Sequence, residues 1–228
     1  MLLSDRKETG RIMPDIYIHN RIHCSPRRWS TVAEGILTLQ HFDIRNEKSS
    51  LYGIWRSQIG LPRDTITVIS SWPNEKIAKA IAPRAFDKLE FIESIETSFM
   101  TPSVRPTTHD RPKRQGNYAF RWFDTPKSHF DEFLKLCTEA WPNFERKYDS
   151  QIIGLWTIRH DQNDLIRTLL ITRRPSLAMW ERSKIPIGVT ETKVREKLNR
   201  RYDLCNWTTV HTTTLFTADD IQDTARWS

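Results

Sequence analysis

The segment Leu51-Tyr52-Gly53-Ile54-Trp55 recurs 101 residues later as Ile152-Ile153-Gly154-Leu155-Trp156. In both copies a glycine precedes a tryptophan by two positions, within a run of aliphatic and aromatic residues that is typical of a β-strand. A long segment that recurs with the same internal spacing indicates that one structural unit occurs twice in the chain.

The same offset relates the segments on the N-terminal side of this pair. Tyr17 and Tyr118 each open an extended run, and an amphipathic helix is predicted after each run. Ser25-Pro26 and Thr125-Pro126 lie between run and helix, and we interpret each pair as an N-cap followed by proline at the first helical position. The predicted buried helix faces are Trp29, Val32, Ala33, Ile36 and Gln40 in the first half, and Phe130, Phe133, Leu134, Cys137 and Trp141 in the second.

The C-terminal part of each half continues the parallel. Residues 65–72 and 165–172 are predicted strands, and a second helix is expected over residues 74–89. Its counterpart is predicted to begin near Ser176, to break around Ile185-Pro186-Ile187-Gly188 and to resume over residues 191–202. A final strand is predicted in each half, over residues 91–100 and 207–216. Each half therefore has the order β-α-β-β-α-β.

This order predicts an α+β fold made of two tandem ferredoxin-like modules. One face of each sheet would carry helices, and the other face is too apolar to remain in water. We therefore expect the two sheets to pair within the chain as a pseudo-dimeric α/β barrel. The predicted organisation is a disordered tail (1–13), a first module (14–104), a linker (105–116), a second module (117–219) and a C-terminal tail (220–228).

The repeated motifs resemble those of the NIPSNAP family. The resemblance rests on Gly53-x-Trp55-Arg56, on Gly154-x-Trp156, and on the repeat ending Phe99-Met100-Thr101-Pro102. Tyr118-Ala119-Phe120-Arg121 resembles the family's Tyr-Glu-Leu-Arg opening, whereas the first half has Asn20 at the arginine position. The resemblance implies the dimeric α/β-barrel fold. That class includes cofactor-free monooxygenases, haem enzymes, small isomerases and binding proteins, so fold alone does not choose the activity.

The first strand supplies candidate site residues. Alternate residues of a strand face opposite sides of the sheet, and the isoleucines in this run are expected to face the helices. Tyr17, His19, Arg21 and His23 would then face the barrel interior. A polar, aromatic wall of this kind is typical of a ligand site. The alternative is that Arg21 and His23 are solvated at the barrel mouth.

The last strand and the repeated tryptophans supply further candidates. Trp207, Thr209, His211 and Thr213 share one strand face, which places His211 inside the second module. The alternative for His211 is a structural hydrogen-bonding role. Trp55 and Trp156 could form a stacking surface, but packing beneath the helices is the preferred interpretation because aromatic burial needs no further explanation.

These candidates define the predicted site. His19 and His211 are the expected general bases and Arg121 the stabiliser of an anion or enolate. Ligand binding is assigned to five residues: Tyr17, Arg21, Tyr118, Trp122 and Thr209. The predicted function is binding of a small apolar or aromatic molecule, with acid–base or oxygen chemistry of the monooxygenase or isomerase type. Haem is a candidate cofactor, with His19 or His211 as axial ligand. The alternative function is a non-catalytic binding or scaffold protein with a packed barrel interior.

Composition limits the remaining classes. The formal charge is +7, but acidic and basic residues are interspersed, so neither nucleic-acid binding nor an electrostatic adaptor role is preferred. No apolar run is long enough for a membrane span. Three cysteines without metal-ligand spacing predict reduced thiols, no metal site and a cytoplasmic location. The expected partner is a small molecule, and a homo-oligomer is left open.

Overall fold

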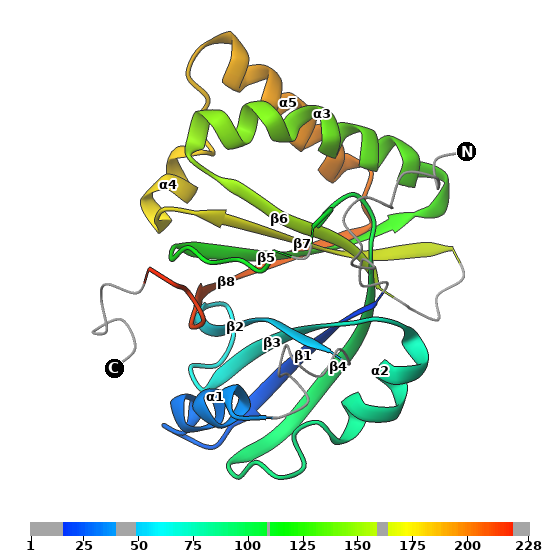
Figure 1. Cartoon of the computed structure of the whole chain (residues 1–228). Helices are drawn as coiled ribbons and strands as arrows, with labels where there is room; N and C mark the ends of the chain where they lie inside the picture. The colour runs from blue at the N-terminus through cyan, green and yellow to red at the C-terminus, as the bar shows by residue number, and fades with distance from the viewer. Residues whose placement is uncertain (1–15, 40–48, 109, 159–163, 221–228) are drawn as a thin grey trace.

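The computed structural model describes residues 16–39, 49–108, 110–158 and 164–220. Within these residues, eight antiparallel strands close into a barrel, and helices pack on its outside (Figure 1). The fold is therefore α+β, as predicted. The strands are β1 (Ile16–Cys24), β2 (Ser50–Ile59), β3 (Thr65–Trp72), β4 (Ile92–Pro102), β5 (Asn117–Pro126), β6 (Gln151–Ile158), β7 (Leu165–Arg174) and β8 (Trp207–Leu215).

The strands of the two halves follow one order. It is β4-β1-β3-β2 in the first half and β8-β5-β7-β6 in the second. Tyr17 of β1 lies opposite residues of β3 and β4, and Tyr118 of β5 lies opposite the corresponding residues of β7 and β8. The barrel closes where β2 pairs with β8 and β4 pairs with β6. Each half therefore supplies the hydrogen-bonding edges that the other half needs.

The helices cover the outer faces of the two sheets (Figure 1). Asn74 accepts a hydrogen bond from Ile77 N (2.9 Å) and caps α2, and Ser176 accepts one from Met179 N (3.2 Å) and caps α4. The predicted break after α4 is present, and the chain re-enters a helix at Gly188. The helices are α1 (Trp29–Leu37), α2 (Glu75–Ile81), η3 (Ala82–Arg84), η4 (Lys127–His129), α3 (Phe130–Tyr148), α4 (Leu177–Arg182) and α5 (Gly188–Asp203).

The two predicted Ser/Thr-Pro caps are wrong. α1 begins at Trp29, after a turn in which Arg28 N donates to Ser25 O (3.0 Å). In the second half the β5–β7 ladder extends through Pro126, and the Thr125 hydroxyl contacts Cys205 Sγ at 3.4 Å instead of a backbone N–H. Strand pairing therefore continues past the position where local sequence suggested a helix start.

The described residues form three clusters of buried hydrophobic side chains. The first contains Ile16, Ile18 and Ile22 of β1, which pack against α1 and α2 as predicted. The other outer cluster lies beneath α3 and α5 and includes Phe133 and Cys137 of the predicted helix face. Gln40 lies outside the described residues. The third cluster occupies the barrel interior and consists almost entirely of strand residues.

Trp55 and Trp156 belong to the interior cluster, so the prediction that they pack beneath the helices is wrong. A β-bulge in each strand shifts the alternation just before the glycine, and so changes the face of the tryptophan two residues later. Each indole then lies over the glycine two residues earlier. A Cβ atom on Gly53 would lie 2.5 Å from Trp55 Cη2, and one on Gly154 would lie still closer to Trp156 Cη2. This close approach explains why both copies have glycine two positions before tryptophan.

The segment between the halves is tied to the barrel. Ser103 N donates to Leu155 O (2.9 Å), and Leu155 N donates to Arg105 O (3.0 Å). Arg111 donates to Thr217 O at 2.7 Å and so links this segment to the end of the chain. The predicted tail 1–13 lies outside the described residues, as does all of the predicted C-terminal tail except Asp220, which accepts a hydrogen bond from Gln115 N.

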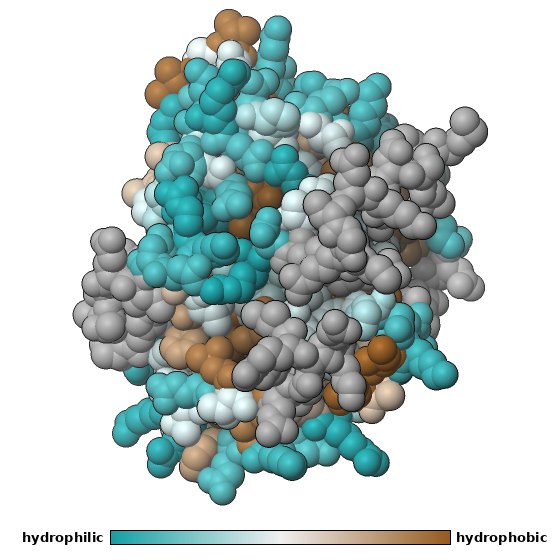
Figure 2. Space-filling view, viewed as in Figure 1, coloured by the Kyte–Doolittle hydropathy of each residue, from teal (hydrophilic) through white to brown (hydrophobic). Residues whose placement is uncertain are grey.

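The surface is mostly polar, with local apolar patches (Figure 2). The turn between α4 and α5 and the start of α5 form one of them, because Ile185, Ile187 and Val189 are each more than 60% exposed. Among the described helices, none has the length and hydrophobicity that a membrane crossing requires.

Candidate functional site

A cavity of about 470 Å³ opens at one mouth of the barrel, and we refer to it as the mouth cavity. It lies where β1 and β5 end and where β4 and β8 begin, so both halves contribute to its wall. The lining residues are His19, Arg21, Gly60, Leu61, Glu96, Ser98, Trp122, Ile158, Arg167, Trp207, Thr209, Val210 and His211.

Two histidines from opposite halves form the floor of the mouth cavity. His19 lies edge-on to Trp122, with ring centroids 5.2 Å apart, and His211 stacks on Phe120 at 5.3 Å. Both imidazoles are almost completely buried. The Nε2 atom of each has no hydrogen-bond partner among the described residues.

Both histidines are uncharged at neutral pH. Burial, assisted by the charge of Arg21 and by His211, lowers the pKa of His19 to about 3. Burial and Arg21 lower the pKa of His211 to about 4. Because a base this weak is a poor match for proton abstraction near pH 7, these imidazoles suit hydrogen bonding in the neutral form better than the predicted role of general base.

The charged residues of the mouth cavity are paired. Arg21 Nη1 lies 3.0 Å from Glu96 Oε2, and His23 Nε2 lies 3.6 Å from the other oxygen of the same carboxylate. Arg167 makes two hydrogen bonds to Asp124, at 2.7 and 2.6 Å, and this interaction raises the pKa of Arg167. The cavity therefore presents aromatic, hydroxyl and neutral imidazole groups beside two compensated ion pairs.

Gly60 brings the β2–β3 turn against the floor. Its φ of +95° lies in the region that favours glycine, and a Cβ atom there would lie 3.1 Å from His211 Cβ. The turn can therefore approach His211 more closely than a turn with a side chain at this position.

The structure brings together five of the eight predicted site residues: His19, Arg21, Trp122, Thr209 and His211 all line the mouth cavity. Tyr17 and Tyr118 also face the interior but lie deeper. Tyr17 packs against Tyr52 and Trp156, and the Tyr118 hydroxyl donates to Arg114 O.

Arg121 is separated from the other predicted catalytic residues. It faces the opposite side of β5, where its guanidinium lies 5.3 Å from the ring of Tyr202 on α5. Strand alternation explains this placement, because its neighbours Phe120 and Trp122 face the interior.

Sequence reasoning missed Glu96, Ser98, Arg167 and Ile158, which also line the mouth cavity. Glu96 and Ser98 alternate along β4, and they lie opposite Arg21 and His19 in the β1–β4 register. Knowledge of that register would have identified both residues. The sequence alone did not supply it, because β1 and β4 are far apart in the chain.

The histidines of the floor do not fit a haem. An axial ligand must present a nitrogen to the iron, yet the Nε2 atoms of His19 and His211 are both buried beneath the cavity surface. Neither Nε2 atom can therefore bind an iron without rearrangement of the floor. Among the described residues, no group of three or more His, Cys, Asp and Glu side chains is arranged to hold a metal ion.

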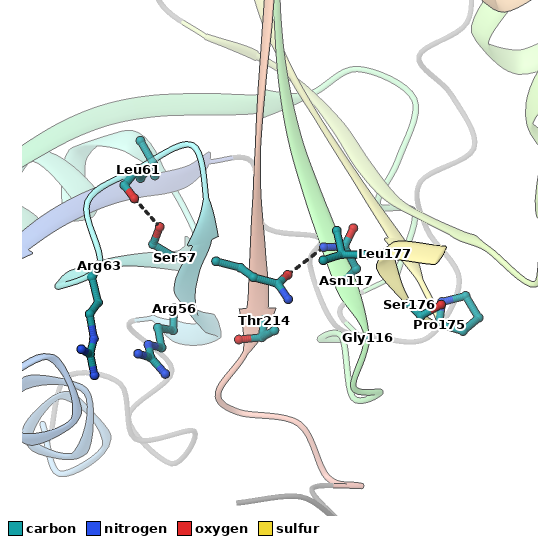
Figure 3. A pocket seen from close by; sticks show the side chains of 11 residues that line it. Arg56, Ser57, Leu61, Arg63, Gly116, Asn117, Pro175, Ser176, Leu177 and Thr214 are labelled. Atoms are coloured by element: carbon teal, nitrogen blue, oxygen red, sulfur yellow. Dashed lines mark hydrogen bonds between the residues drawn. The ribbon is translucent and has the colours of Figure 1, made fainter. Parts of the chain in front are cut away.

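A larger cavity, of about 770 Å³, lies on the outer face of the barrel where β2, β8 and β5 adjoin (Figure 3). Asn117 Nδ2 donates to Gln58 Oε1 across the two halves at 2.9 Å, and Ser57 Oγ donates to Leu61 O at 3.0 Å. Arg56 and Arg63 project in a similar direction on one side (Figure 3). None of the described residues that line this cavity is aromatic, whereas Trp122 and Trp207 line the mouth cavity, so it is a weaker candidate for an aromatic ligand.

Comparison with known proteins supports the fold. No protein-family model matches the chain, and no curated protein matches it. An anthrone oxidase-like protein is 13% identical, with a TM-score of 0.57 over 88% of this chain and 90% of its own. A putative monooxygenase from Lactobacillus acidophilus NCFM is 10% identical, with a TM-score of 0.59 over 90% and 98% of the two chains. A mutant chlorite dismutase from Candidatus Nitrospira defluvii is 5% identical, with a TM-score of 0.57 over 89% and 92%. The chain therefore has the fold of the dimeric α/β-barrel proteins.

Proposed function

We propose that this protein binds a small, uncharged aromatic molecule in the mouth cavity. The observation that carries the proposal is the cavity floor, where two neutral histidines from opposite halves lie against Phe120 beneath a cavity of 470 Å³. A concave site with aromatic walls and a few polar groups is the usual form of a small-molecule site.

The lining indicates the chemistry of the ligand. Trp122 and Trp207 offer aromatic surface, and Ser98 and Thr209 offer hydroxyl groups. Because each arginine of the wall is already paired with a carboxylate, a charged ligand would gain little from it. A flat phenol or ketone, with an oxygen atom for the hydroxyls and a ring for the indoles, matches this surface best.

Isothermal titration calorimetry with 1-naphthol tests the binding proposal. Saturable binding is expected, and Thr209→Trp should weaken it at least tenfold, which is about 1.4 kcal/mol, because the new side chain fills the cavity. Thr208→Trp is the matched control, since Thr208 lies on the outer face of the same strand. Absence of binding to the unmodified protein, or equal effects of the two variants, would contradict the proposal.

Oxygen chemistry on the bound molecule is the second candidate. The barrel fold shared with an anthrone oxidase-like protein and a putative monooxygenase supports it, as does the apolar interior beneath the floor. The reaction would convert a ring methylene to a ketone with O₂, one oxygen atom entering the ketone and the other leaving as water. Oxygen consumption with anthrone, measured on the purified protein and on Thr209→Trp, tests it. If oxygen is consumed at the same rate by the protein, by Thr209→Trp and in buffer alone, the protein does not catalyse this reaction and binding remains its proposed function.

We also infer that the halves are two NIPSNAP-like modules, over residues 14–104 and 117–219, joined by residues 105–116. The equal strand order and the identical glycine–tryptophan packing support this inference. An alignment of homologous chains tests it. The offset of 101 residues between the two glycines should persist, and single-module relatives should dimerise with β2 paired to the partner's fourth strand.

A further inference from the structure

Five basic side chains converge in the second half, between the sheet and its helices. Arg121 comes from β5 and Arg174 from the end of β7, Lys184 from the turn after α4, and Arg195 and Arg201 from α5; all five line one small cavity. We refer to these five residues as the cation cluster. It lies on the opposite face of β5 from the mouth cavity and is therefore a separate site.

Within the part of the chain that the structure describes, no carboxylate compensates the cation cluster. None of the described residues that line the cavity is acidic. Glu191 of α5 is engaged elsewhere, since it accepts hydrogen bonds from Arg182, Tyr148 and Ile187 N. The mouth cavity differs in this respect, because each of its arginines has an acidic partner.

The most deeply buried members have donors without acceptors. Arg174 is 8% exposed, and its Nε and Nη1 atoms have no hydrogen-bond partner among the described residues. Arg201 is 3% exposed; its Nη1 atom donates to Cys137 Sγ at 3.6 Å and its guanidinium lies over the rings of Phe123 and Tyr202, but its Nε atom has no hydrogen-bond partner among the described residues. Aromatic rings contact both guanidinium groups, but a buried cation without a carboxylate partner and with unsatisfied donors is still unfavourable. An anion in this cavity would accept hydrogen bonds from these donors and would stabilise the cluster.

The local electrostatics agree with this arrangement. Burial, followed by the charges of Arg121, Arg195 and Arg201, lowers the pKa of Arg174 to about 9, so it remains a cation near pH 7. Burial alone would raise the pKa of Tyr202, but the neighbouring Arg201, Arg121 and Lys184 lower it below its usual value. The cluster therefore favours negative charge on whatever lies within it.

The cavity limits the size of the anion. Its volume of about 30 Å³ exceeds the ~10–15 Å³ that one water molecule needs, but it leaves no space for a bulky ligand. Guanidinium groups bind tetrahedral oxyanions through paired hydrogen bonds. From this geometry we propose that the cation cluster binds one compact oxyanion, namely a phosphate group.

The first half lacks this site. The β1–β3 and β5–β7 registers place Asn20 at the position of Arg121 and Trp72 at the position of Arg174. Both have partners: Asn20 Oδ1 accepts from the Thr97 hydroxyl at 2.8 Å, and Trp72 Nε1 donates to Ser70 Oγ at 2.8 Å. The two cations are therefore a property of the second half and not a requirement of the fold.

Thermal unfolding in the presence of inorganic phosphate tests the proposal. The full chain is compared in phosphate-free buffer and in buffer with increasing phosphate, with sodium chloride adjusted to hold the ionic strength constant. The melting temperature should rise saturably, by about 5–10 °C at a hundredfold excess over Kd. A rise no larger than that given by sodium chloride would overturn the proposal.

Two variants locate the site. Arg174→Met removes the unpartnered guanidinium, and Arg121→Asn introduces the residue of the first half. Each should abolish the phosphate-dependent shift while melting no lower than the unmodified protein in phosphate-free buffer. Arg84→Met, at an exposed arginine of the first half, is the control and should retain the shift. If Arg174→Met and Arg121→Asn both retain it, the anion binds elsewhere and the proposal is wrong.

The same titration with glycerol 3-phosphate distinguishes the source of the group. A shift with inorganic phosphate alone assigns the free ion to the site. A larger shift with the ester assigns the phosphate group of an organic molecule, the remainder of which would have to lie outside the cavity.

Discussion

His211 stacks on Phe120 across the β5–β8 ladder, with ring centroids 5.3 Å apart and ring planes inclined by 19°. His19 approaches the same phenylalanine from the other half, at 6.3 Å. Both imidazoles therefore rest on one apolar ring, in surroundings that disfavour their protonation.

The two histidines should make the protein less stable in mild acid. Their folded-state pKa values, about 3 and about 4, lie below the ordinary value of 6.5. The unfolded chain therefore binds more protons than the folded one once the pH falls below 6.5, and stability decreases from there down to the folded pKa values. Each histidine is expected to lower the free energy of unfolding at pH 5 by about 2 kcal/mol relative to pH 7.5. Urea unfolding at the two pH values measures the loss.

Substitution of one histidine isolates its share of this loss. His19→Phe should reduce the difference between the two pH values by about 2 kcal/mol. His129→Gln, at an exposed histidine that precedes α3, is the control and should leave the difference unchanged. An unaltered difference in His19→Phe would show that other groups cause the acid sensitivity.

Gly154→Ala should destabilise the barrel interior. The new methyl group would collide with the indole of Trp156, which is fully buried and has little room to move. Overpacking of this kind costs about 1–3 kcal/mol, measurable as a lower urea midpoint. In a protein that already carries Trp156→Leu, Gly154→Ala should lower the free energy of unfolding by much less than it does in the unmodified protein. Strict additivity of the two substitutions would contradict the proposed contact.

Asp124→Asn should destabilise the wall of the mouth cavity. Asp124 is 6% exposed and accepts two hydrogen bonds from Arg167. Loss of its charge leaves the guanidinium without a counterion, at a cost of about 1–3 kcal/mol. Because the Arg167 side chain is 32% exposed, water limits this cost. The double variant Asp124→Asn/Arg167→Gln should recover part of the stability, and a double variant no better than Asp124→Asn would refute the coupling.

Gly60→Ala should perturb the cavity floor. The substitution combines a φ of +95° with a Cβ atom 3.1 Å from His211 Cβ. Strain in that backbone region costs about 1–2 kcal/mol, and displacement of His211 should weaken the binding of 1-naphthol. Calorimetry and urea unfolding on one preparation measure both effects. Gly188→Ala is the control, because Gly188 also has a positive φ but no atom within 4 Å of an added Cβ. It should lose stability without loss of binding.

The fold was predictable because it repeats. The repeated glycine–tryptophan segment aligned the two halves, so that the remaining differences in length could be recognised as insertions. The order β-α-β-β-α-β could then be assigned to both halves. The β-bulges were not predictable. Each adds one residue just before Gly53 or Gly154 and so reverses the face that simple alternation predicts for Trp55 or Trp156.

The candidate site was predictable where alternation within one strand decided the facing of a side chain. That rule placed His19 and Arg21 on β1, and Thr209 and His211 on β8, all of which line the mouth cavity. It did not place Glu96 or Arg167, which depends on pairing between distant strands. The cation cluster was missed because its members come from two strands, a turn and a helix, and no local pattern connects them.

The closure of the barrel within one chain affects how a ligand can lie in it. In a barrel made of two identical chains, every side chain at the mouth has an identical copy on the opposite wall. A bound molecule therefore has two equivalent poses. Here the position 101 residues after His19 holds Phe120, and the position 101 residues after Arg21 holds Trp122. The opposing walls are therefore unlike, and an asymmetric guest should adopt a single pose.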